Sequence, residues 1–196
     1  MTSDEEIRHL VSQRLADCFE QLPLAPAVGT KLASALRDEA IEIQPWSFQQ
    51  LLTVKEHATK PYNILGLEKP DKAPQVVYYK PIKAAQLFVS VAGGIAGASS
   101  PVLVGLAVIS ALLAVVDVRT AASPSECLLF WILYDTETHG MDRAIAREAF
   151  CRELKSYAGI ADGDFEPALH ALVRLGCLQE SMGLIEIADK IIIRLR

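Results

Sequence analysis

Apolar side chains recur at helical spacing along the first part of the chain, residues 1–60, and predict an amphipathic helical region. One stripe of the first helix holds Ile7, Leu10, Val11, Leu15 and Cys18. Ser3 precedes three acidic residues, a pattern typical of a helix start. Two further helices are predicted, over residues 28–41 and 46–58.

The next segment, residues 61–83, is a proline-rich connector in which residues 75–79 predict a short strand. The connector leads into 33 consecutive residues without a charge, from 84 to 116. The sequence Ser99-Ser100-Pro101 interrupts this block near its middle. We therefore predict an uncharged helical hairpin over residues 84–117.

The last part of the chain, residues 123–196, is charged and periodic again and predicts three helices followed by strands. The first helix covers 125–134, the second begins at Met141 or Asp142, and the third runs from Asp162 or Asp164 to a stop at Gly176. The strand-like runs are 177–180, 184–187 and 190–195, with Met182-Gly183 joining the first two.

This order of elements, together with the segment ALHALVRLGCLQES at residues 168–181, resembles a winged helix-turn-helix domain over residues 123–195. The resemblance implies a small α+β domain in which the third helix is the recognition helix. The polar groups on the expected surface of that helix are Glu166, His170 and Arg174. Domains of this family often bind DNA, and they also serve as assembly modules in multi-subunit complexes. The resemblance therefore implies either nucleic acid or protein as the partner.

The charge balance favours a protein partner for this domain. Residues 123–196 hold twelve acidic and eight basic side chains, and the whole chain holds 24 and 19, for a formal net charge of −5. Tight binding to duplex DNA relies on roughly 6–10 contacts from Lys and Arg to phosphates. With 51% hydrophobic and 7% aromatic residues, the composition also excludes a disordered tail, a disulfide-stapled mini-protein and a basic coat protein of nucleic acid.

Membrane contact is the first explanation for the uncharged hairpin. Gly93 and Gly97 have the small-residue spacing of helices packed in lipid, and basic residues flank both ends of the block, which predicts cytoplasmic termini. Each arm makes only about 22 Å of helix, less than the roughly 30 Å of a hydrocarbon core, so we expect a re-entrant or oligomer-lined hairpin. The residues expected to face lipid or a partner are Leu87, Phe88, Gly93, Gly97, Val102, Leu106, Ile109 and Leu113.

Two alternatives remain for the same block. It fits a buried helical hairpin in a soluble protein, covered by the amphipathic flanks or by partner subunits. It also resembles a dinucleotide fingerprint, with a strand-like LFVS before Ala92-x-Gly94-x-x-Gly97 and Asp117 further on. Alanine in place of the first glycine and Pro101 just inside the expected helix argue against that site. We favour membrane contact over burial, and either over a nucleotide site, and predict no cofactor.

Candidate chemistry along the chain is sparse. Four cysteines stand apart in apolar contexts, without metal-binding spacing, and are expected to be buried in a reducing compartment: Cys18, Cys127, Cys151 and Cys177. The four histidines are isolated, and no catalytic motif is found. A polar loop holds Asp135, Glu137, His139 and Asp142 at spacing that could bind a cation, but a solvated turn is favoured. The sequence thus predicts neither catalysis nor a metal site.

The sequence therefore predicts a mainly α protein in which a helical N-terminal region and an apolar hairpin precede a small α+β, winged-helix-like domain. The expected function is that of a non-enzymatic adaptor or membrane-associated effector subunit of a bacterial complex, with homo- or hetero-oligomeric protein partners. The alternative is a soluble winged-helix DNA-binding regulator with residues 84–116 in an oligomer interface. The acidic start predicts a protein that is not secreted and lies on the cytoplasmic side, at the inner membrane where the hairpin inserts. The predicted contact with a membrane or a partner rests on one premise, that a chain of 196 residues cannot bury the uncharged residues 84–116 on its own.

Overall fold

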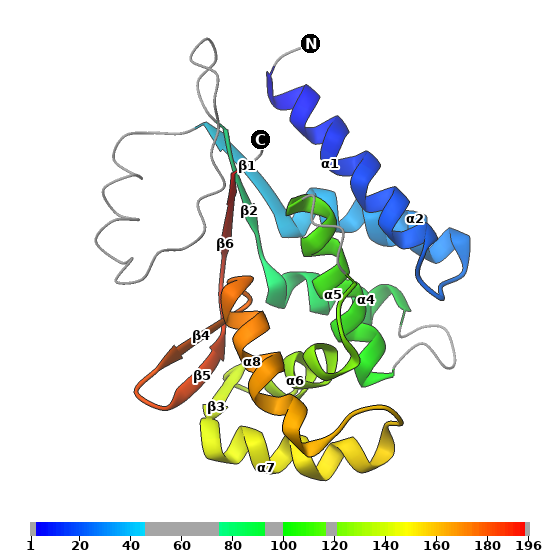
Figure 1. Cartoon of the computed structure of the whole chain (residues 1–196). Coiled ribbons are helices and arrows are strands. Elements are labelled where there is room, and N and C mark those ends of the chain that lie inside the picture. Colours follow the sequence, from blue (N-terminus) through cyan, green and yellow to red (C-terminus); the bar gives the residue numbers. More distant parts are fainter. Residues whose placement is uncertain (1–2, 46–74, 93–99, 117–120, 195–196) are drawn as a thin grey trace.

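The computed structural model describes residues 3–45, 75–92, 100–116 and 121–194, which form helices and small antiparallel sheets (Figure 1). The first half contains α1 (Ser3–Glu20), α2 (Pro26–Ala35), the π-helical turn η1 (Leu36–Ala40), β1 (Ile41–Pro45), β2 (Gln75–Tyr79), α4 (Pro81–Ala92) and α5 (Pro101–Val116). The second half contains α6 (Pro124–Tyr134), β3 (Gly140–Asp142), α7 (Arg143–Glu153), the 3-10 turns η2 (Leu154–Ser156) and η3 (Asp162–Asp164), α8 (Phe165–Arg174), β4 (Leu178–Ser181), β5 (Leu184–Ile187) and β6 (Ile191–Arg194). The predicted fold class, mainly α with a small α+β part at the C-terminal end, is confirmed.

Local signals placed several elements correctly. The strand predicted at residues 75–79 is β2, and α7 begins directly after Asp142 as expected. Helix α6 begins at Pro124, because Ser123 and Glu126 form a capping box in which each side chain accepts the other's backbone N–H at 3.2 Å. The helix predicted over residues 46–58 lies outside the described residues.

The helix predicted over residues 28–41 is shorter than expected. Helix α2 ends at Ala35, the π-helical turn carries the chain to Ala40, and Ile41 then opens strand β1 opposite Tyr79 of β2. Ile41 is buried in the structure. The sequence alone does not distinguish helix from strand at this position, since an apolar residue fits both the apolar stripe of a helix and the inner face of a strand. Pairing with a strand 38 positions away, which no local pattern reveals, decided the outcome.

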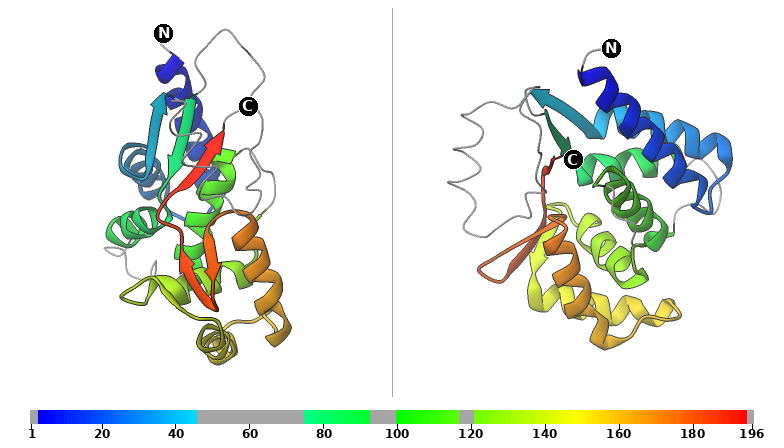
Figure 2. Two further views of the ribbon diagram at one scale, coloured as in Figure 1. Left: turned by 90° about the vertical axis from the view of Figure 1, so that its left-hand side faces the viewer. Right: turned by 45° about the horizontal axis from the view of Figure 1, so that its top comes forward.

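The two halves of the chain share a sheet. Strands β1, β2 and β6 form one antiparallel sheet in that order, and β3, β5 and β4 form the other. Figure 2 shows β6 running beside β2. The run at residues 190–195, grouped with the C-terminal domain in the sequence analysis, therefore pairs with the N-terminal half, with Ile193 opposite Val77.

Helix α5 lies at the centre of the molecule, between α1 and α6 in Figure 1, and it also packs against α4 and β6. Its buried side chains are Val104, Ala107, Val108, Ile109, Ala111, Leu112, Leu113 and Val115. The premise that this chain cannot cover the uncharged block alone is therefore wrong for the described part of the block. Among the residues described, no helix combines the length and apolarity needed to cross a bilayer.

Two contacts hold α5 in this central position. A Cβ atom at Gly105 would lie 2.3 Å from the carbonyl oxygen of Cys127, so only glycine permits α5 to approach α6 this closely. On another side, the buried hydroxyl of Tyr79 in β2 donates a hydrogen bond to the carbonyl oxygen of Val108 at 2.7 Å. Helix α5 is thus covered by helices on both sides and hydrogen-bonded to the first sheet.

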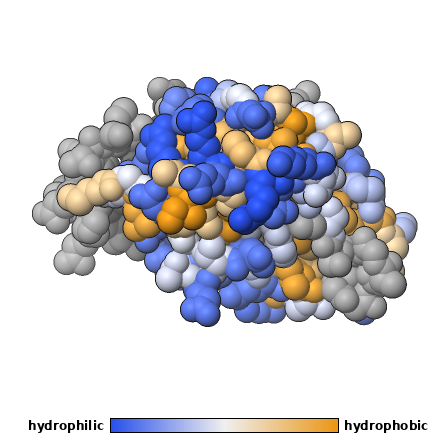
Figure 3. Space-filling view, turned by 90° about the horizontal axis from the view of Figure 1, so that it is seen from below, coloured by the Kyte–Doolittle hydropathy of each residue, from blue (hydrophilic) through white to orange (hydrophobic). Residues whose placement is uncertain are grey.

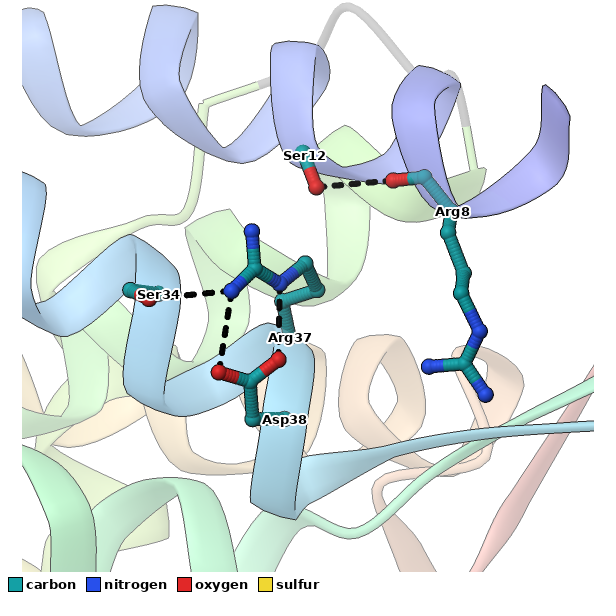
Figure 4. A network of polar contacts seen from close by, with 5 residues as sticks. All are labelled: Arg8, Ser12, Ser34, Arg37 and Asp38. Carbon is teal, nitrogen blue, oxygen red and sulfur yellow. Dashed lines mark hydrogen bonds and ion pairs between the residues drawn. The ribbon is translucent and has the colours of Figure 1, made fainter. Parts of the chain in front are cut away.

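Polar side chains form a hydrogen-bonded network at the surface where η1 faces α1 (Figure 4). The Arg37 guanidinium donates to both carboxylate oxygens of Asp38, at 2.7 and 2.9 Å, and to Ser34 Oγ at 3.1 Å. These hydrogen bonds from Arg37 lower the pKa of the Asp38 carboxyl. Exposed pairs of this kind add little to stability.

Candidate protein-docking surface

The segment from α6 to β5, residues 123–187, is called the C-terminal module here. Helices α7 and α8 both contact α6, and the three short strands complete the module in the chain order helix, strand, helix, helix, hairpin. Strand β3 was missed by the sequence analysis, which placed a polar loop there. It has only three residues and pairs through β5, with Gly140 opposite Glu186, so no local periodicity marked it.

Backbone capping positions α7 and α8. The Asp142 carboxylate accepts hydrogen bonds from the backbone N–H groups of Ala144 and Ile145, at 2.8 and 3.4 Å, and so caps α7. Helix α8 ends at Arg174, and the predicted stop residue, Gly176, follows with a φ of 78° that suits glycine. Its N–H donates to the carbonyl of Val173 at 3.0 Å, and the next N–H, from Cys177, donates to that of Leu172 at 2.9 Å.

Helix α8 buries one face in the module and presents the other to solvent. Leu169 and Leu172 are fully buried, whereas the three residues predicted for its outer surface, Glu166, His170 and Arg174, are half-buried, exposed and exposed, respectively. The outer surface therefore carries one carboxylate, one imidazole and one guanidinium, and this single guanidinium is far fewer than the roughly 6–10 phosphate contacts of tight DNA binders.

Arg143, the first residue of α7, connects three elements. Its guanidinium donates to Glu180 of β4 and to Glu166 of α8, each at 2.5 Å. The hydrogen bonds with Glu180 and Glu166 raise the pKa of Arg143. Because both acceptors are carboxylates, Arg143 is ion-paired within the module.

The β4–β5 hairpin projects from the module with an apolar tip. Its two turn residues, Met182 and Gly183, have φ values of 50° and 84°, as in the two-residue turns that match the strand twist. Met182 is fully exposed, and Leu184 is 40% exposed. The whole hairpin, residues 178–187, contains two glutamates and neither lysine nor arginine.

A further exposed apolar residue lies close to this hairpin. Ile145, 58% exposed, belongs to the first turn of α7, where Arg143 N–H donates to the carbonyl of Gly183 at 2.8 Å. Figure 3 shows the lower face of the molecule, where apolar side chains gather among polar ones at the end from which the hairpin projects. We call Ile145, Met182 and Leu184 the tip patch.

The predicted hairpin residues of the uncharged block form no such surface. Leu87, Phe88, Ile109 and Leu113 are buried, and Val102 and Leu106 are partly buried against the core. Gly93 and Gly97 lie outside the described residues. The expectation that these side chains face lipid or a partner is thus corrected for the six described ones, which pack inside their own chain.

The remaining chemical hypotheses find little support. The dinucleotide fingerprint requires a strand at LFVS, but these residues belong to helix α4. Within the described ranges, no group of three or more His, Cys, Asp or Glu residues is placed to hold a metal ion. In the polar loop, Asp142 caps α7 and His139 Nδ1 contacts the carbonyl oxygen of Tyr134 at 2.9 Å, so these groups serve the local structure.

The four cysteines are free thiols: Cys127 and Cys177 are buried as expected, whereas Cys18 and Cys151 are only half-buried. Burial raises the pKa of Cys18 to about 11 and those of Cys127 and Cys177 to about 12. Because the thiolate is the reactive form, these three thiols are poor nucleophiles at neutral pH.

Comparison of the chain with protein-family models, curated proteins and solved structures found no match.

Proposed function

We propose that this protein is a non-enzymatic adaptor subunit whose C-terminal module, arranged as a winged helix, docks a protein partner through the tip patch. The chain order of the module supports the winged-helix assignment, with α8 in the place of the recognition helix and the β4–β5 hairpin in that of the wing. The observation that carries the docking function is the exposed apolar tip of a hairpin that contains no basic residue.

The tip patch has the chemistry of a protein anchor. Full burial of a Leu, Ile or Met side chain contributes about 1.5–3 kcal/mol, and interface energy concentrates in a few such residues. The three side chains project from an ordered hairpin and a capped helix, so little backbone freedom is lost when a partner covers them. The acidic side chains of the hairpin and α8 supply the polar rim.

The electrostatics argue against the alternative, a DNA-binding regulator. Arg143 is already paired with Glu166 and Glu180, and the hairpin contributes carboxylates where a DNA-binding wing contributes lysine or arginine. The alternative of a membrane-associated subunit also loses its main support, because the described part of residues 84–116 is buried in contacts with α1 and α6 and between α4 and α5.

Site-specific photocrosslinking in the source cells tests this function. The photoreactive residue p-benzoylphenylalanine is placed at Met182 of the full chain, with matched placements at Val89 and Ile192, which are exposed apolar residues outside the module. We expect one discrete protein adduct at Met182 that disappears in the Leu184→Glu variant and is absent at the two control positions. An adduct pattern that is equal at all three positions, or no adduct at Met182, contradicts the proposal.

A mobility-shift assay tests the alternative directly. We expect no complex with duplex DNA at about 50 mM salt, where phosphate contacts are strongest. A complex that forms at this salt concentration and weakens by about 10³-fold or more at about 200 mM would establish DNA binding in place of protein docking.

A further inference from the structure

A cleft of about 500 Å³ opens at the base of the β4–β5 hairpin, where the C-terminal module meets the first residues of α4 and the turn into β6. This volume falls within the range of sites that hold small ligands or single side chains. Its lining includes Ile82, His139, Glu186, Ile187, Asp189 and Lys190. Two isoleucines thus lie beside an imidazole, two carboxylates and one ammonium group.

The imidazole of His139 is held in a fixed orientation at this cleft. Its ring stacks on Tyr134, with centroids 5.3 Å apart and an interplanar angle of 5°. Its Nδ1 lies 2.9 Å from the Tyr134 carbonyl oxygen, which can only accept, so in the neutral ring Nδ1 carries the proton and Nε2 has the lone pair. The backbone of His139 is fixed as well, since its carbonyl oxygen accepts from Ile187 N–H at 2.9 Å.

The charges at the cleft leave a negative excess. Glu186 and Asp189 form no ion pair with any residue that the structure describes. The ammonium of Lys190, which also lines the cleft, is directed toward the first sheet, 3.7 Å from the Glu42 carboxylate and 5.6 Å from the centroid of the Tyr78 ring. Two carboxylates therefore face one ammonium in the lining, and that ammonium already has a carboxylate partner in the first sheet.

Gly140 favours the position of one of these carboxylates. A Cβ atom at Gly140 would lie 2.7 Å from Cγ of Glu186, so the absent side chain lets the glutamate lie across β3. Glu186 also shares the outer face of β5 with Leu184, two residues away, which separates them by about 7 Å along the strand. Glu186 of the cleft and Leu184 of the tip patch thus lie on the same face of one strand.

We propose that this cleft binds an arginine side chain of the partner that docks on the tip patch, an inference that rests on the proposed function. The methylene stem of arginine suits the two isoleucines, and its planar guanidinium offers five donors to Glu186, Asp189 and His139 Nε2. Lysine is the poorer occupant, because an ammonium is a compact charge that cannot span two carboxylates in one plane. The partner segment accordingly carries an apolar residue near its arginine.

Titration of the full chain, with histidine labelled at Cε1, tests the cleft without the partner. The probe is N-acetyl-arginine amide, and the His139 signal is identified by the His139→Gln variant. We expect saturable movement of that signal with a dissociation constant of about 1–10 mM, as is typical of a single side chain. Glu186→Gln and Asp189→Asn should each weaken binding roughly tenfold, because each removes a charge-assisted hydrogen bond.

Matched controls make the result decisive. Glu148→Gln, at an exposed site on α7, should bind the arginine amide like the unmodified chain, and N-acetyl-citrulline amide, which lacks the charge, should not move the His139 signal. No movement up to about 50 mM arginine amide overturns the proposal. Equal binding of N-acetyl-lysine amide overturns the guanidinium assignment, and tighter binding of agmatine points to a free guanidine in place of a partner side chain.

The arginine-binding cleft and the docking function can be refuted independently of each other. If Met182 gives its adduct but the arginine amide does not bind, docking stands and the cleft assignment is wrong. If the arginine amide binds but Met182 gives no adduct, the cation site is real but does not serve the partner proposed here, and the proposal is likewise overturned.

Discussion

The backbone of Gly105 in α5 passes so close to Cys127 in α6 that a Cβ atom on the glycine would lie 2.3 Å from the cysteine's carbonyl oxygen. Such a distance is too short for any real Cβ atom, so residue 105 must be glycine for the two helices to remain this close. Through this contact, α6 covers α5, the most apolar of the helices that the structure describes.

Gly105→Ala should therefore destabilise the protein by about 1–3 kcal/mol or more, since the two backbones must separate to admit a methyl group. The free energy of unfolding from urea titration measures the effect. Gly29→Ala is the matched control, because its Cβ would meet Phe19 at an ordinary 3.5 Å and alanine favours a helix over glycine. An equal loss in both variants would contradict the importance of the close approach.

Asp142→Ala should destabilise the C-terminal module by about 0.5–2 kcal/mol, because two backbone N–H groups of α7 lose their acceptor. The same urea titration measures it. Asp162→Ala, which removes a carboxylate from an exposed turn, should leave stability within about 0.5 kcal/mol. Asp142→Asn should retain most of the stability, since asparagine also caps helices.

Stability should fall as the pH rises above about 9. In the unfolded chain a cysteine ionises with a pKa near 9.0, whereas burial holds the folded Cys18 near 11 and Cys127 and Cys177 near 12. The folded state thus binds more protons than the unfolded state in this range, and stability is lost as pH rises from about 9 toward 11 or 12.

Unfolding free energies at pH 7.5, 9 and 10.5 test this dependence, and Cys177→Ala should show a smaller loss between the two upper values than the unmodified chain. A loss that is equal in both proteins would assign the effect to other groups, such as the buried Tyr79, whose pKa is also raised by burial.

Met182→Ser should leave the stability of the isolated chain unchanged within about 0.5 kcal/mol, because the side chain is fully exposed at the hairpin turn. The same change should weaken partner binding by roughly tenfold or more, since an apolar anchor is lost. Thermal unfolding and affinity for the crosslinked partner provide the two measurements. Unchanged affinity would exclude Met182 from the interface.

Much of the local structure could be predicted because short-range patterns control it. The ends of α7 and α8 follow from Asp142 as a cap and Gly176 as a left-handed stop, and the turn at Met182-Gly183 follows from the two apolar runs beside it. The candidate surface residues of α8 were found in the same way, from the helical period around Leu169 and Leu172. The tip patch and the cleft carried no comparable signal.

Long-range pairing accounts for the failures. Strand β3 has three residues, β1 follows a π-helical turn, and β6 crosses to the N-terminal sheet, so each depends on a partner strand that local spacing does not reveal. The orientation of His139 toward a cleft likewise arises from the pairing of β3 with β5.

The amino-acid pattern established that residues 84–116 avoid water, since a segment apolar on every side must be covered. It could not establish what covers them, because lipid, a partner and the chain's own helices satisfy the same hydrophobic requirement. The tertiary structure answers this question for the described residues, because α1, α4 and α6 surround α5. Gly105 permits the close approach of α5 to α6, and the Tyr79 hydroxyl hydrogen-bonds to the backbone of α5. The local sequence thus determined that this segment is buried, whereas contacts between distant segments determined which parts of the chain bury it.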